Sequence, residues 1–111
     1  MAASAAYWLA SAANEVIITP SGEVGSIGVL AAHQDVSAAM DRDGIKTTLV
    51  SAGRYKTEGN PFEPLTDDAR GYLQSRVDDY YGMFIRAVAD HRRVKIDAVR
   101  DGFGSGRSTR R

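Results

Sequence analysis

The sequence predicts an α/β fold in which a parallel sheet is layered with helices, and a long amphipathic helix lies toward the C-terminus. Short β-branched runs alternate with helix-forming stretches, glycine-containing turns separate them, and an apolar stripe at helical spacing follows residue 66. With 111 residues, 43% of them hydrophobic, the chain can bury one modest core. We therefore expect one domain or part of one.

The first half of the chain is predicted to begin with a helix and then to alternate strand and helix. Residues 4–13 are rich in alanine and predict a helix, and the β-branched run 15–19 predicts a buried strand. Residues 29–30 and 47–51 are predicted as further strands, and 35–42 as a second helix. Strands separated by helices favour a parallel sheet.

The second half begins with a long polar loop, 53–65, and continues as a helix over 66–91. Thr66 is the expected N-cap of that helix, and its apolar stripe consists of Ala69, Leu73, Val77, Tyr80, Phe84 and Val88. A shorter helix is predicted over 96–100. We expect residues 1–101 to form the folded part and 102–111 a disordered basic tail.

The charge balance and composition exclude several functions. The chain holds 14 basic and 14 acidic residues, so nothing favours nucleic acid or an anionic membrane, although basic residues dominate after Arg86. The absence of cysteine excludes disulfides, a thiolate nucleophile and a cysteine-rich zinc site, and we expect no metal and no cofactor. No apolar run approaches the length of a membrane span.

Ser4 is the candidate nucleophile. It stands between alanines at the start of a predicted helix, where backbone N–H groups are free and little side-chain bulk blocks the hydroxyl. The same position suits an ordinary helix N-cap. A serine attacks a carbonyl only when a nearby base takes its proton, so the chain must also supply that base.

Lys56 in the polar loop is the candidate base. A lysine amine accepts a proton at neutral pH only where burial or nearby positive charge lowers its pKa from about 10.4. A solvated surface lysine is the alternative. A Ser-His-Asp arrangement with His33 and Asp35 is a further alternative that their spacing does not demonstrate, and His91 at a helix C-terminus suits the helix dipole.

Three segments of the sequence resemble the SppA-type signal peptide peptidases and the related phage head-maturation (protein C type) proteases, which share the ClpP/crotonase-like fold. Residues 2–14 are similar to the nucleophile segment of that family, the Val-Gly-Ser-Ile-Gly-Val run at 24–29 to its second signature, and residues 53–65 to its lysine loop. The resemblance covers residues 2–101. It implies that the chain is the C-terminal half of a catalytic domain, a partial ClpP/crotonase-like fold.

The resemblance implies a Ser-Lys dyad for peptide-bond hydrolysis. Ser4 corresponds to the nucleophile and Lys56 to the general base, which reverses the surface interpretation of the lysine. The backbone N–H of Ala5 is the implied oxyanion donor, and Ser26 the implied hydrogen-bond partner that orients the lysine amine.

The phage branch of the family is the more similar one, with an SppA-type signal peptide peptidase as the alternative. The implied partners are a polypeptide substrate and further copies of the chain in a homo-oligomer, and the implied location is the host cytoplasm or the phage prohead. Membrane association through a missing N-terminal segment is the alternative location. Two other functions stay open, an inactive truncated oligomerisation or scaffold module and acyl-CoA chemistry.

Overall fold

The structure, a computed structural model, describes residues 1–103 and 105–109 and divides into two compact units. The first unit combines Met1–Leu30 with Val77–Arg111, and the second consists of Ala31–Arg76. The candidate nucleophile Ser4 therefore belongs to the first unit and the candidate base Lys56 to the second.

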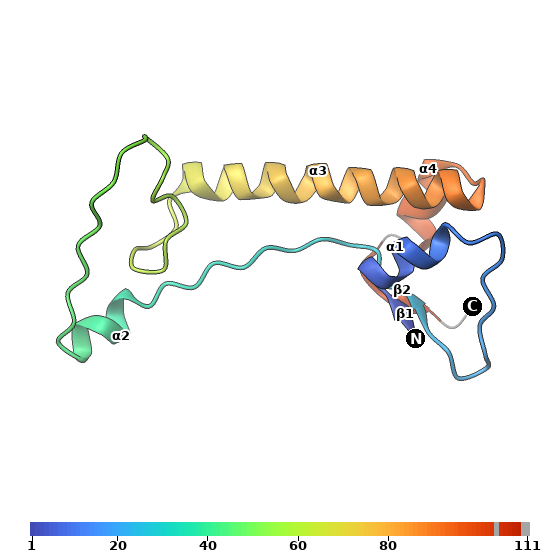
Figure 1. Cartoon of the computed structure of the whole chain (residues 1–111), viewed down its shortest axis with the longest axis horizontal. Coiled ribbons are helices and arrows are strands. Elements are labelled where there is room, and N and C mark those ends of the chain that lie inside the picture. The colour runs from blue at the N-terminus through green and yellow to red at the C-terminus, as the bar shows by residue number, and fades with distance from the viewer. Residues whose placement is uncertain (104, 110–111) are drawn as a thin grey trace. The chain divides into compact units, whose positions relative to one another are not determined.

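The first unit contains a small mixed sheet (Figure 1) with the strand order β1-β2-β3. β1 (Ala2–Ala3) runs parallel to β2 (Val24–Gly25), and β3 (Ser108–Thr109) is antiparallel to β2. The α/β class predicted from the sequence is confirmed, but the purely parallel sheet is corrected to a mixed one. Residues 26–107 separate β2 from β3 in the sequence, and β3 returns in the direction opposite to β2. Local sequence does not determine the direction in which two such distant segments pair.

The residues of β3 fall inside the stretch that the sequence predicts to be a disordered tail. Arg107 O accepts a hydrogen bond from Ser26 N at 3.0 Å, and Gly106 N donates to Ile27 O at 3.0 Å. Gly25 lies at φ +103°, and a Cβ there would meet Arg107 O at 3.3 Å, so a glycine permits this close approach. The segment 106–109 thus pairs with backbone N–H and C=O groups of residues 24–27. Residues 104, 110 and 111, which share that prediction, lie outside the described residues.

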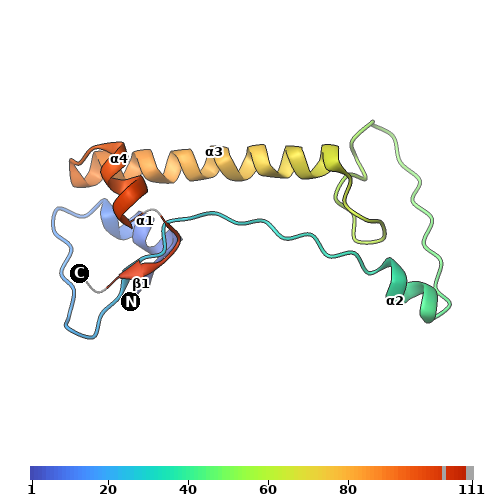
Figure 2. The same cartoon turned by 180° about the vertical axis from the view of Figure 1, so that it is seen from behind.

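The helices follow the sequence prediction closely. α1 (Ala5–Ser11), α2 (Ser37–Arg42) and α3 (Asp67–Arg92) each lie within two residues of their predicted bounds. Thr66 caps α3, because its Oγ1 accepts a hydrogen bond from Ala69 N at 3.1 Å. After α3 come α4 (Ile96–Ala98) and the π-helix η1 (Val99–Phe103), which lie beside α1 and the C-terminal end of α3 (Figure 2).

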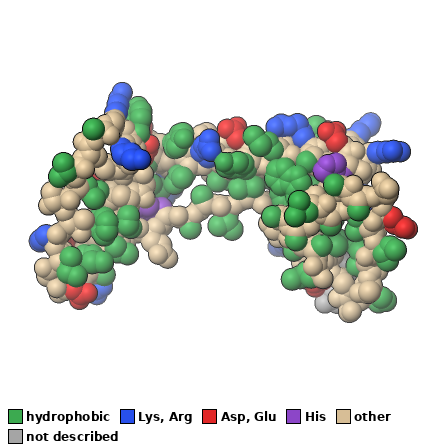
Figure 3. All heavy atoms as spheres, viewed as in Figure 1, with side chains coloured by type: hydrophobic (Ala, Val, Ile, Leu, Met, Phe, Trp, Pro, Cys, Tyr) green, Lys and Arg blue, Asp and Glu red, His purple; other side chains and the backbone are tan. Residues whose placement is uncertain are grey.

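Three predicted strands are not strands in the structure. Among the described residues, 15–19, 29–30 and 47–51 pair with no neighbouring strand. Each run carries a strongly exposed apolar side chain, Ile17 at 82%, Leu30 at 86% and Val50 at 94%. Hydrophobic side chains reach the surface in both units (Figure 3). A β-branched run becomes a strand only where another strand supplies hydrogen-bond partners, and local sequence does not provide them.

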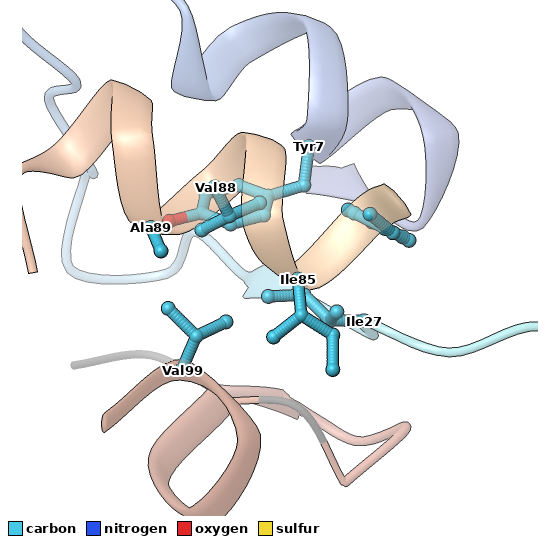
Figure 4. Packing of buried hydrophobic residues seen from close by; sticks show 7 residues of the cluster. Tyr7, Ile27, Ile85, Val88, Ala89 and Val99 are labelled. Atoms are coloured by element: carbon cyan, nitrogen blue, oxygen red, sulfur yellow. The ribbon is translucent and has the colours of Figure 1, made fainter. Parts of the chain in front are cut away.

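The core of the first unit packs the C-terminal part of α3 against α1 and the segment after β2 (Figure 4). Its buried members are Tyr7, Ile27, Phe84, Ile85, Val88, Ala89 and Val99. The rings of Trp8 and Phe84 stack with centroids 4.7 Å apart and planes 13° from parallel. This packing fixes α1, and with it the residue that precedes α1, Ser4.

Polar contacts fix the other end of α1. The buried hydroxyl of Ser11 donates to Trp8 O at 2.7 Å and lies 2.9 Å from His91 Nδ1. A hydroxyl carries one hydrogen, so His91 Nδ1 donates to Ser11 Oγ. Arg92 Nη1 donates to Ala13 O at 2.9 Å, just beyond the helix. His91 therefore serves α1 as a structural partner.

Within the described part of the chain, none of the helices has both the length and the hydropathy that crossing a membrane requires.

Candidate functional site

Ser4 occupies a strained turn between β1 and α1. Its φ of 55° and ψ of −129° lie in a region that L-residues rarely adopt. Ser4 N donates to Gly25 O at 2.7 Å, and Ser4 O accepts from Tyr7 N at 2.9 Å and Trp8 N at 3.0 Å. Bonds to the sheet on one side and to the helix on the other therefore hold the strained conformation.

The Ser4 side chain is exposed and makes no capping hydrogen bond to α1. Ser4 therefore stands at the N-cap position of α1, as the alternative interpretation expects, but its side chain does not cap the helix. The first N–H groups of a helix, here those of Ala5 and Ala6, have no intrahelical acceptor. A serine on a sharp, strained strand-to-helix turn is how several hydrolases present a nucleophile.

A pocket of about 530 Å³ in the first unit brings Ser4, Ala5 and Ser26 together. Ser26 also has a positive φ, 52°, and its main chain is held by the bond to Arg107 O. The other lining residues are mostly apolar: Trp8, Gly28, Val29, Leu30, Tyr80, Phe84 and Gly106. Tyr80 and Phe84 belong to the apolar stripe predicted from the sequence, and their i, i+4 spacing is the one signal that they line the same pocket.

Strain at Ser4 predicts a measurable difference between two variants. Ser4→Gly is expected to have a free energy of unfolding about 1–2 kcal/mol higher than Ser4→Ala, because glycine adopts a positive φ without steric cost. Urea denaturation of the two variants measures the difference. Both lack the hydroxyl, so its loss cancels. Equal stabilities would show that the turn at Ser4 is unstrained.

Lys56 lies in the second unit, in a series of turns between Gly53 and Asn60. Lys56 N donates to Gly53 O at 3.1 Å and Glu58 N to Tyr55 O at 3.1 Å. The Lys56 side chain is exposed. The turns give its backbone a defined conformation, and its pairing with Ser4 stays a prediction.

The alternative triad residues have other partners. Asp35 Oδ1 accepts a hydrogen bond from Ser37 N at 2.9 Å at the start of α2, and hydrogen bonds from Ser37 hold the pKa of this carboxyl below its usual value. His33 Nε2 lies 2.8 Å from Asn60 O. Neither contact joins His33 to Asp35 in the manner of a catalytic pair. Among the described residues no three His, Asp or Glu side chains gather as a metal site.

Comparison with known proteins places these residues in a family. The family model described as "Peptidase family S49" matches residues 1–105. Capsid assembly protease C of Escherichia phage lambda is 40% identical over 101 residues, and the head-tail preconnector protein of Enterobacteria phage P21 is 37% identical over 98. A putative signal peptide peptidase SppA of Enterococcus faecium is 24% identical over 100 residues.

These matches cover most of this chain but a small part of each relative. They span 91%, 88% and 90% of the chain, and 23%, 20% and 29% of the lambda, P21 and Enterococcus proteins. The resemblance to phage head-maturation and SppA-type peptidases is confirmed. The chain belongs to peptidase family S49.

Proposed function

We propose that the chain carries the nucleophile and the general base of a serine peptidase, with Ser4 and Lys56 as a Ser-Lys dyad. The observation that carries the proposal is the strained, exposed position of Ser4 between β1 and α1, in a chain that family S49 matches. The lambda relative is described as a capsid assembly protease, which favours polypeptides of a phage head as the substrate. Family membership favours a partial ClpP/crotonase-like fold.

The reaction follows from the roles of the residues. Uncharged Lys56 Nζ takes the proton of Ser4 as Oγ attacks the carbonyl carbon of the scissile peptide bond. The Ala5 N–H donates to the oxyanion, and the lysine then gives its proton to the departing amine. Water attacks the resulting ester, Lys56 takes a proton from that water, and the proton returns to Ser4 when the acid leaves. The Ser26 hydroxyl orients the lysine amine.

Labelling with a phosphonofluoridate tests the dyad in the intact protein. The reagent forms a covalent bond to an activated serine, so mass spectrometry is expected to find the label on Ser4. The label should be absent from Ser4→Ala and at least about 100-fold slower to form in Lys56→Ala. Ser21→Ala serves as the matched control, because Ser21 is another exposed serine of the first unit that does not line the pocket beside Ser4. Equal labelling rates in the wild type and Lys56→Ala would remove the proposed base.

An oligomerisation module is the second candidate, and the exposed apolar runs favour it. Ile17, Leu30 and Val50 stand on extended segments that pair with no strand among the described residues. Unpaired extended backbone and exposed apolar side chains promote association. Light scattering of Ser4→Ala tests this candidate, since self-association that does not depend on the nucleophile is expected of such a module. A monomer at high concentration would exclude it.

A further inference from the structure

We propose that His33 is a positioning residue for the loop that carries Lys56, and that it acts by donating a hydrogen bond from Nε2 to the main-chain oxygen of Asn60. The evidence that the loop is anchored comes from hydrogen bonds within the second unit. Its catalytic consequence rests on the proposed function, because it requires Lys56 to be the base.

The contact itself defines the protonation of the ring. His33 Nε2 lies 2.8 Å from Asn60 O, and a carbonyl oxygen can only accept a hydrogen bond. The hydrogen therefore resides on Nε2, and the uncharged ring is the Nε2–H tautomer with Nδ1 free of hydrogen. The side chain joins two segments that are 27 residues apart in the sequence.

Asn60 is the residue at which hydrogen bonds anchor the loop. Its side-chain amide donates to Thr57 O at 2.8 Å, its Oδ1 accepts from Phe62 N at 2.9 Å, and its N–H donates to Thr57 O at 3.1 Å. The next carbonyl, that of Pro61, accepts from Val36 N at 2.8 Å. Two consecutive carbonyls of the loop are thus bound to the segment that leads into α2, one by a side chain and one by backbone.

The anchored residue Asn60 directly follows the turns that contain Lys56. Lys56 N bonds Gly53 O, Glu58 N bonds Tyr55 O, and Asn60 N bonds Thr57 O, so the turns overlap from Gly53 to Asn60. A general base must stay within hydrogen-bond reach of the proton that it removes. Loosening Asn60 frees the end of this series and spreads the positions of the Lys56 amine.

Two amide variants test the anchoring. The Nε2 of glutamine reaches the position of the imidazole Nε2, whereas asparagine is one methylene shorter and cannot reach Asn60 O. Hydrogen–deuterium exchange of the Asn60 and Phe62 amides is expected to be about tenfold faster in His33→Asn, and within about twofold of wild type in His33→Gln. Gln34→Ala, a neighbouring exposed position, is the matched control with wild-type exchange.

The tautomer gives a readout that needs no variant. Long-range ¹H–¹⁵N correlation spectra of the wild-type protein at about pH 8 are expected to show hydrogen on His33 Nε2 and none on Nδ1. An Nδ1–H ring would overturn the inference. Equal exchange in His33→Gln and His33→Asn would overturn it as well.

Kinetics separate this inference from the proposed function. In the intact protein His33→Asn is expected to lower kcat about tenfold with KM within about twofold, and His33→Gln to restore kcat, because the substrate pocket beside Ser4 is untouched. If the exchange rates separate as expected and kcat stays unchanged in His33→Asn, the loop is anchored by His33 but Lys56 is not the base. The anchoring then stands and the dyad fails.

Discussion

Lys56→Ala in the intact protein is expected to lower kcat for peptide hydrolysis by about 10²–10⁴-fold while KM changes little. A general base contributes rate by removing the serine proton in the transition state, and contributes little to binding of the ground state. Steady-state kinetics on an unstructured polypeptide substrate measure the effect. A loss confined to KM would assign Lys56 to substrate binding.

Lys46→Ala is the control for a general effect of removing a lysine. Lys46 lies in the same unit, exposed and paired with Asp41 at 3.0 Å, and a surface pair of this kind contributes little. Its kcat is expected to equal that of the wild type. The double variant Ser4→Ala with Lys56→Ala is expected to be no slower than Ser4→Ala alone, because the two residues act as a unit.

Phe84→Ala is expected to lower the free energy of unfolding by about 3–5 kcal/mol, the largest stability effect that we predict. Phe84 is 2% exposed, stacks on Trp8 and lines the pocket beside Ser4. Removing the ring leaves a cavity and an unsupported Trp8 on α1. Urea denaturation followed by circular dichroism measures the loss.

Met83→Ala is the matched control for Phe84, because it is the preceding residue of α3 and 48% exposed. Met83→Ala is expected to lower the free energy of unfolding by less than about 1 kcal/mol. Similar losses in both variants would mean that helix formation, and not packing against α1, sets the stability of this region.

The helices were predictable because their signals are local. Thr66 and the stripe that includes Phe84 and Val88 predicted α3, and the alanine-rich start predicted α1. Helix hydrogen bonds join residues of one segment, so composition, capping and periodicity are enough. The strands were not predictable, because β-branched runs such as 15–19 carry a propensity without a partner, while the sheet pairs Val24 and Gly25, which lie outside every predicted strand.

The candidate site likewise has a part that the sequence predicted and a part that only the structure showed. Residue types and resemblance pointed to Ser4, Ala5 and Ser26, and the structure brings these three to one pocket. The histidines were ambiguous in the sequence. The partners that distinguish them, Asn60 for His33 and Ser11 for His91, lie 27 and 80 residues away, beyond any local pattern.

The amino-acid sequence by itself determined the α/β class, the positions of the three main helices, the peptidase family and the candidate nucleophile, since each depends on residue identity or on spacing along one segment. Tertiary structure alone decided the mixed order of the sheet, the positive φ of Ser4 and the apolar wall beside it. These features arise from hydrogen bonds and packing between distant segments, such as Ser4 N to Gly25 O and Trp8 to Phe84. The free energy of these contacts depends on which distant segments the folded chain brings together. The propensities of single segments do not encode that.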